Sequence, residues 1–431
     1  MKKGSLFTAF LVVLVDLLGF GIVLPLLPFY AQTFDASAVV VGLLYSVYSF
    51  AQLIFSPIWG SYSDRVGRRP IMMLSTFGAV LAYVIFGLAG SLWVLFLSRI
   101  LAGVMGGNIS TAQAYIADVT TEADRAKGMG LIGAAFGIGF AVGPALASLL
   151  LHDSLANSIS SLGWTQAAAF ITANKYSLPG FFAAGLSLVS FLLVVFKLPE
   201  PQKQVTGRTD KEDTQEETSA PNKRHSIFTK AFWQQISWQQ KQAGGAMLLP
   251  LLIGMFVLAF SQANLYSAFP LFSKQELGLS ADQVGVQFFF IGIIAVIVQG
   301  GLIRYLTKYF REESIFTTGV VLMLLGMFLI PWATTKFELS LFLIVMALGA
   351  SLNLPTMQSL ISKEAGVDNV GAIMGTSQGL SGLGRMLGPT WGGFWFGIYF
   401  GLPFLITAGV LLVNVWIGWK LLQHSNKFRS E

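Results

Sequence analysis

Long apolar runs dominate the pattern of hydrophobic and polar positions along this chain, and short polar stretches separate them. Each run has about 20 residues or more, which is the length that a helix needs to cross the ~30 Å hydrocarbon core of a bilayer. Backbone groups in lipid must be hydrogen-bonded within the segment, so these runs predict helices. The sequence lacks the alternation of polarity over about ten residues that marks a membrane β-barrel. The pattern therefore predicts an all-α polytopic membrane protein.

The apolar runs number twelve and fall into two sets of six, which predicts two six-helix pseudo-repeats. We expect spans at 6–30, 38–59, 71–89, 92–118, 127–151 and 179–197, and at 246–268, 282–303, 314–334, 338–362, 370–396 and 401–422. The predicted domains are an N-terminal bundle at 1–197, a cytoplasmic linker at 198–244 and a C-terminal bundle at 245–431. Within the linker, residues 227–236 have helical spacing of apolar positions, which leaves open an interfacial helix or a partly ordered lead into the next span. The outer loop at 152–178 is unusually long and suggests no role.

Composition and charge set the orientation of these spans. The chain is 54% hydrophobic and 11% charged, whereas soluble domains have roughly 25% charged residues. Of the 27 Lys and Arg residues, two lie within spans and three lie in loops of one face: Lys175, Lys274 and Lys336. The others lie on the opposite face, which predicts that this face and both termini are cytoplasmic. Because the basic residues follow membrane topology, the net charge of +6 does not indicate nucleic-acid binding.

Three ionisable residues lie deep within predicted spans: Asp16, Arg99 and Arg385. Such residues are costly in hydrocarbon, so each one is a functional candidate. At about 1.5 Å per residue, Asp16 lies about 15 Å beyond Leu6, near the midplane, and Arg99 lies about 10 Å from the outer end of its span. A carboxylate and a cation at similar depth are suited to binding and releasing a proton. A static ion pair, or a bond from Asp16 to backbone near Pro25, remains open.

Arg385 has no acidic partner in the interior of the spans of its half, because Asp16 is the only acid that lies away from the ends of any predicted span. Two roles remain open for it: attraction of an anionic substrate group, or donation to carbonyls of neighbouring helices. Transporter sites lie near the midplane between repeats, so we expect a substrate cavity there. Its predicted polar liners, each of which has interhelical hydrogen bonding as the alternative, are Gln52, Asn108, Gln113, Gln262, Asn264, Asn353, Gln378 and Arg385.

A loop dense in charge and glycine joins the second and third predicted spans. It reads Gly60-Ser-Tyr-Ser-Asp64-Arg65-Val-Gly67-Arg68-Arg69-Pro70. Two spans in equivalent places of the two halves also share a small-residue pattern: Gly139-x-x-x-Gly143-Pro144 and Gly384-x-x-x-Gly388-Pro389. Small residues at this spacing let helices approach closely, and proline bends a membrane helix. The repetition predicts two parallel repeats related about the membrane normal.

These motifs resemble those of a known family. The loop at 60–70 is similar, position for position, to the signature loop of the major facilitator superfamily. The run from Asp16 through Gly19, Gly21 and Pro25 to Pro28 resembles the first span of drug:proton antiporters of the tetracycline-efflux type, as does Gln52. The segment Arg99-Ile-Leu-Ala-Gly103 and the run from Gly139 to Pro144 resemble the same group's motifs in spans four and five.

The resemblance implies proton-relay roles for Asp16 and Arg99 and a conformational gate formed by the residues of the loop together with Asp118. In that gate, Asp64 is expected to meet the positive amino end of a second-half helix. Arg69 is expected to pair with Asp118 at the inner end of span four. The ninth span, Gly319 to Trp332, is apolar apart from its ends, which argues against magnesium-tetracycline as the substrate.

The sequence as a whole predicts a secondary active transporter in a bacterial inner membrane that exports amphipathic or cationic small molecules in exchange for protons. It is expected to act as a monomer, with the proton as coupling ion, a small-molecule substrate, no metal and no other cofactor. A facilitator or proton-coupled transporter of a sugar, metabolite or lipid remains the alternative. A membrane-embedded enzyme is disfavoured, because the three histidines, His152, His225 and His424, are scattered in loops or a tail.

Overall fold

The computed structural model describes residues 3–120, 122–201, 247–365 and 370–430, and long helices make up most of them. The helices of the first half are α1 (Lys3–Gln32), α2 (Ala38–Val66), α3 (Arg68–Gly87), α4 (Leu92–Met105), α5 (Asn108–Val119), α6 (Glu122–Leu151) and α9 (Ser177–Lys197). Those of the second half are α11 (Leu248–Leu277), α12 (Ala281–Ile297), α13 (Ile303–Tyr309), α14 (Glu312–Leu329), α15 (Lys336–Glu364), α16 (Val370–Ile398) and α17 (Leu402–Ser430). No strand occurs among these described residues, so the predicted all-α fold is confirmed.

The twelve predicted spans correspond to these helices. The fourth span consists of α4 and α5 together, and the eighth consists of α12 and α13 joined by a π-helical turn at Val298–Leu302. Eleven candidate spans in the described part of the chain are long and apolar enough to cross a bilayer. The remaining long helix, α16, is rich in glycine and contains Arg385, which lowers its hydropathy. The predicted linker falls almost entirely on residues 202–246, and with it the predicted helix at 227–236; both therefore lie outside the described residues.

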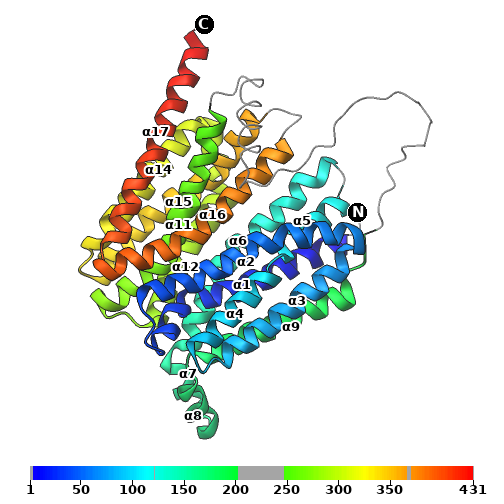
Figure 1. The fold of residues 1–431 in the computed structure, drawn as a ribbon, viewed down its shortest axis with the longest axis vertical. Coiled ribbons are helices and arrows are strands. Elements are labelled where there is room, and N and C mark those ends of the chain that lie inside the picture. Colours follow the sequence, from blue (N-terminus) through cyan, green and yellow to red (C-terminus); the bar gives the residue numbers. More distant parts are fainter. Residues whose placement is uncertain (1–2, 121, 202–246, 366–369, 431) are drawn as a thin grey trace, which may run out of the picture.

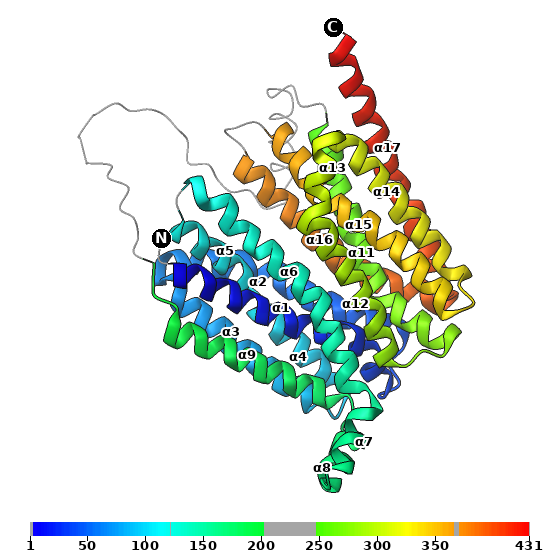
Figure 2. The same cartoon turned by 180° about the vertical axis from the view of Figure 1, so that it is seen from behind.

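The two bundles lie at an angle to each other (Figures 1 and 2). They converge near the short helices α7 (Asp153–Ser161) and α8 (Thr165–Ala173), and diverge toward the ends of the chain. We call these the hairpin side and the terminal side. The long loop at 152–178 thus contains a helical hairpin that protrudes from the molecule. Lys175 donates a 2.7 Å hydrogen bond to Asp153 at its base, which lowers the pKa of that carboxyl.

The two glycine motifs have equivalent packing roles in the two halves. A Cβ at Gly139 would lie 2.6 Å from that of Leu17, and one at Gly143 would lie 2.7 Å from the Cα of Gly21, so α6 packs closely on α1. In the second half, a Cβ at Gly384 would lie 2.7 Å from the Phe256 carbonyl oxygen, which places α16 equally close to α11. The motif of span five therefore packs on span one, and that of span eleven packs on span seven.

The bundles meet each other through the same two motif helices. The Pro144 carbonyl oxygen of α6 would lie 2.9 Å from a Cβ at Gly285 of α12, and the Pro389 carbonyl of α16 faces Gly42 of α2. Ser46 of α2 accepts a 2.7 Å hydrogen bond from the Thr390 hydroxyl. All these residues lie between the hairpin side and the middle of their helices. The close contacts across the halves thus hold the hairpin side together.

Candidate functional site

One face of α1 places Asp16 against two tyrosines of neighbouring helices. Three residues beyond Asp16, a Cβ at Gly19 would lie 3.0 Å from the Tyr83 hydroxyl. Four residues beyond it, the Phe20 ring centroid lies 5.3 Å from that of Tyr48. Residues at these spacings share a helix face. The charge of Asp16 accordingly acts on both tyrosines.

Arg99 interacts with the same tyrosines. Its side chain is 3% exposed, and its guanidinium carbon lies 4.9 Å from the Phe86 ring centroid and 5.9 Å from that of Tyr83. Electrostatically it acts on Tyr83, Tyr48 and Tyr45. Tyr48 and Tyr83 thus interact electrostatically with both Asp16 and Arg99.

Tyr45 fixes this part of α2 to α1. Its hydroxyl donates a 2.5 Å hydrogen bond to the Leu24 carbonyl oxygen. Within a helix this carbonyl would accept from the backbone amide four residues later, but that residue is Pro28, which has no N–H. A side chain of the next helix thus satisfies the acceptor that the proline leaves open, as helix-breaking residues in membranes require.

Arg385 and its neighbours form the second-half side of the site. The Arg385 side chain is exposed, and its charge acts on Tyr48 of the first half and Tyr266 of the second. Gln262, one turn before Tyr266 on α11, is also exposed and hydrogen-bonds to the tyrosine hydroxyl. Arg385 therefore acts on one tyrosine from each half of the molecule.

The other predicted liners fall into three groups. Gln113 and Gln378 are exposed. Gln52 is partly buried and donates to the Tyr48 hydroxyl at 3.4 Å, so it orients that tyrosine. The Asn108 side chain lies outside the described part of the structure.

Asn264 and Asn353 differ from the prediction, because the structure encloses both within the second half. Asn264 is fully buried and donates to the Pro403 carbonyl oxygen at 2.9 Å and to the Thr407 hydroxyl. Asn353 is 1% exposed and contacts Met323. Both side chains occupy interhelical packing positions, the alternative that polar residues in spans commonly adopt.

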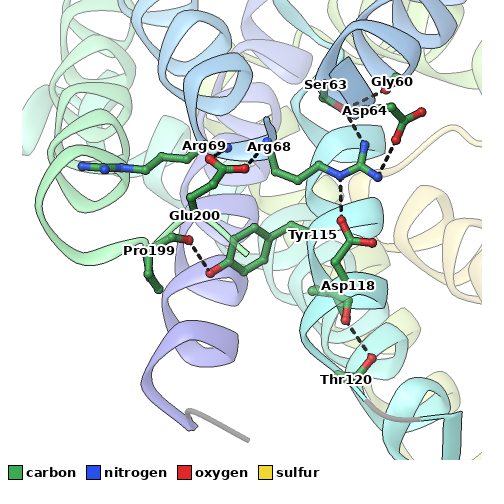
Figure 3. A network of polar contacts seen from close by, with 11 residues as sticks. Gly60, Ser63, Asp64, Arg68, Arg69, Tyr115, Asp118, Thr120, Pro199 and Glu200 are labelled. Carbon is green, nitrogen blue, oxygen red and sulfur yellow. Dashed lines mark hydrogen bonds and ion pairs between the residues drawn. The ribbon is translucent and has the colours of Figure 1, made fainter. Parts of the chain in front are cut away.

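Residues 60–70 were predicted as a loop, but the structure places them in the end of α2 and the start of α3, with Gly67 alone between the two helices. This segment, called the charged loop below, is organised around Arg68 (Figure 3). Its guanidinium bonds to Asp118 at 2.8 Å, to Asp64 at 2.5 Å and to the Ser63 hydroxyl at 2.6 Å. The prediction that Arg69 pairs with Asp118 is therefore wrong: Arg69 points the other way and donates to the Val195 carbonyl oxygen of α9 at 2.5 Å. Asp64 likewise pairs within the loop, rather than with a second-half helix as predicted.

Glu200 is a member of this network that the sequence did not reveal. It lies just beyond α9, and its two carboxylate oxygens accept from the backbone N–H groups of Arg68 at 2.6 Å and Arg69 at 2.9 Å. These are free donors at the start of α3. Gly67 makes the approach possible, because its φ is 113° and a Cβ there would lie 2.8 Å from Glu200 Oε1. The sequence signal for this contact was a lone acid between Pro199 and Pro201, directly after a span.

Two other residues of the loop lie in open surroundings. Arg65 is exposed in the last turn of α2, where its charge is favourable at the carboxyl end of the helix. A Cβ at Gly60 would meet no atom within 4 Å in the described structure. The Gly60 carbonyl oxygen accepts a 2.7 Å hydrogen bond from the Ser63 hydroxyl, so its backbone belongs to the network of Arg68.

The fourth span is interrupted at Gly106 and Gly107, a feature that the sequence prediction missed. Three side chains of α2 and α3 donate to the carbonyls at the end of α4. Trp59 Nε1 donates to Val104 at 2.6 Å, Gln52 to Gly106 at 3.3 Å, and the Ser75 hydroxyl to Met105. Arg99 and Asp118 thus lie on two different helical segments of one span.

Comparison with known proteins identifies the family. The model of the Major Facilitator Superfamily matches residues 9–389 and again 251–430. The chain belongs to the major facilitator superfamily. Family membership makes it a membrane transporter rather than an enzyme.

Other members of the superfamily resemble the chain over most of its length. It is 28% identical to the class E tetracycline resistance protein of Escherichia coli, over 88% of this chain and 85% of that protein. It is 26% identical to multidrug resistance protein 2 of Bacillus subtilis, over 95% and 93% of the two chains. Its fold matches a bacterial homologue of the human lysosomal transporter Spinster with a TM-score of 0.72 at 14% identity, over 99% and 98% of the chains.

Proposed function

We propose that this transporter exports amphipathic or cationic small molecules from a bacterial cell in exchange for protons, with Asp16 as the proton carrier. The placement of Asp16 beside Tyr48 and Tyr83 carries the proposal, because those two tyrosines also interact with Arg99. Protonation of Asp16 changes the charge at the place where the helices of the first half meet. Relatives named for tetracycline and multidrug resistance support export as the direction.

In alternating access, the change of charge at Asp16 alters which side of the molecule is open. While the hairpin side is held together, substrate enters and the proton of Asp16 leaves through the terminal side. We propose that this side faces the cytoplasm, because the arginines of the charged loop lie there. Separation of the contacts between α2 and α16 and between α6 and α12 opens the hairpin side instead. A proton that Asp16 takes up from the hairpin side favours the return to the arrangement closed on that side, so the proton gradient is coupled to substrate export.

The test is transport of a fluorescent amphipathic cation into proteoliposomes with an acidic lumen, with the full-length chain and its Asp16→Asn variant. We expect dye accumulation that requires the pH gradient in the wild type and is lost in the variant. Asp35→Asn is the matched control, because it removes an exposed carboxylate from the loop between α1 and α2. Asparagine also tolerates the positive φ of 56° there.

Equal gradient-driven transport by the wild type and Asp16→Asn would remove Asp16 from the mechanism. Dye movement that ignores the pH gradient would contradict proton exchange and favour a facilitative transporter. Failure to move any dye, with transport of a sugar, metabolite or lipid instead, would replace the export of amphipathic compounds by the alternative substrate class.

A further inference from the structure

Arg385 is a cation in the interior of the molecule to which the described part of the chain supplies no carboxylate partner. The groups that interact with it electrostatically are two neutral phenols, Tyr48 and Tyr266. Its side chain is nevertheless exposed. A charge at this depth is costly unless a counter-charge or water reaches it. Because Arg385 is exposed, water or an anionic group from outside the protein can reach its guanidinium.

The position of Arg385 on α16 shows that it faces the other half of the molecule. Gln378, Gly382, Arg385 and Pro389 follow one another at spacings of four, three and four residues, so they share one face of the helix. A Cβ at Gly382 would lie 2.7 Å from Leu53 of α2, and the Pro389 carbonyl faces Gly42 of α2. Arg385 lies between these two contacts, on the face that meets α2.

A chain of aromatic rings crosses between the halves and ends at the same two tyrosines. The Tyr48 ring centroid lies 5.3 Å from that of Phe20, Phe20 lies 5.8 Å from Phe140, and Phe140 lies 6.2 Å from Tyr266. The rings belong to α2, α1, α6 and α11 in turn. Arg385 interacts with Tyr48 and Tyr266, which are the first and last rings of this chain of four. An apolar surface with one charge at its edge is complementary to an amphiphile with an opposite charge.

We propose that Arg385 binds the anionic group of an amphipathic substrate, whose apolar body lies against Tyr48, Phe20, Phe140 and Tyr266. The preferred substrates are then aromatic or aliphatic molecules that carry a carboxylate or sulfonate, zwitterions included. Cations of the same size lack the bond to Arg385 and bind less tightly, but they remain substrates of the transporter. This inference rests on the proposed function, since it assigns the substrate end of the same transport site. A guanidinium suits such a group because it donates two parallel hydrogen bonds to a carboxylate.

Binding of two probes with the same aromatic body tests the proposal without any gradient. The probes are 1-naphthaleneacetate and 2-(1-naphthyl)ethylammonium, titrated calorimetrically into the full-length protein in detergent. We expect the wild type to bind the acetate more tightly, and Arg385→Gln to weaken acetate binding by about tenfold or more while leaving the ammonium probe unchanged. Arg385→Lys, which keeps the charge, should retain part of the preference.

The matched control is Arg304→Gln, which removes an exposed arginine of α13 and should leave the binding of both probes unchanged. Size-exclusion profiles and thermal unfolding show whether each variant is folded, and Arg385→Lys still answers the question if the glutamine variant is not. Equal binding of the two probes, absent acetate binding by the wild type, or an unchanged preference in Arg385→Gln would overturn the proposal. These outcomes are separate from the Asp16→Asn result. A failure of anion binding would not change a finding of proton-driven dye transport, and a failure of proton-driven dye transport would not change a finding of anion binding at Arg385.

Discussion

At the scale of single residues, Arg68 connects three parts of the terminal side, because its side chain reaches the end of α2 and the end of α5 from the start of α3. It is 14% exposed, whereas Asp118 is 40% exposed, so the pair is partly shielded from water. We expect Arg68→Gln and Asp118→Asn to lower thermal stability or transport to similar extents. The double variant should be little worse than either, with a coupling of roughly 0.5–3 kcal/mol in a double-mutant cycle.

Arg69→Gln is the matched comparison, since it removes an adjacent charge that bonds to backbone carbonyls of α9. It should show no coupling to Asp118→Asn. Additive effects of Arg68→Gln and Asp118→Asn, or coupling through Arg69, would contradict the geometry of the structure.

The sequence predicted the residues of this network but not their pairing. Arg68 and Arg69 are adjacent in a helix, so their side chains point about 100° apart, and one of them alone can face Asp118. Which one does so depends on where α3 begins, and the positive φ of Gly67 and the carboxylate of Glu200 determine that. Asp16, Arg99 and Arg385 were easier to find, because a charge within an apolar run is visible in the sequence itself.

At the scale of elements, the break between α4 and α5 relies on donors from other helices. Trp59 Nε1–H bonds to the Val104 carbonyl at 2.6 Å. Trp59→Phe keeps most of the ring but leaves this acceptor without its donor, so we expect a loss of about 1–3 kcal/mol in the free energy of unfolding. Thermal unfolding of the purified variant measures it. Trp93→Phe, at a position that is 83% exposed, should change little.

An equal effect of the two tryptophan substitutions would mean that the Trp59 bond does not support the break. The sequence predicted the fourth span at nearly its observed limits but not its interruption. Glycine pairs occur elsewhere in the chain without one, as at Gly392 and Gly393 within α16. Tertiary donors, which the sequence pattern does not show, distinguish the two cases.

At the scale of the whole molecule, the halves approach each other through glycines on the hairpin side. A Cβ at Gly42 would overlap the backbone of Pro389, which has no flexible end to move aside. Gly42→Ala should therefore destabilise this arrangement of the halves relative to one opened on the hairpin side. A difference of about 1 kcal/mol changes the ratio of the two states roughly fivefold.

The chain contains no cysteine, so a single Ser46→Cys substitution provides a specific reporter for this change. Ser46 is 7% exposed and bonded to Thr390 across the halves. We expect a membrane-impermeant maleimide on the hairpin side to label this cysteine about fivefold faster when Gly42→Ala is present. Gly90→Ala, which meets no atom within 4 Å in the described structure, is the control. Unchanged labelling in Gly42→Ala would show that this contact does not limit opening.

Most of the architecture was readable from the sequence, because length and apolarity alone mark a membrane helix, and the repeated motifs paired the two halves. The angle between the halves was not readable. It depends on which close contacts the halves form with each other, and a sequence is the same in every arrangement of the halves.

The interruption at Gly106 and Gly107 divides the fourth span into two helical segments, α4 and α5. The first segment, α4, contains Arg99, which interacts with Tyr48 and Tyr83. The second, α5, contains Asp118, which is bonded to Arg68. In an unbroken helix, any rotation at Asp118 would turn Arg99 by the same angle. Because Trp59, Gln52 and Ser75 bind the carbonyls at the interruption, we expect the charged loop to move without displacing Arg99. We therefore expect the proposed gate and the proposed proton-binding residues to move separately, although one span contains parts of both.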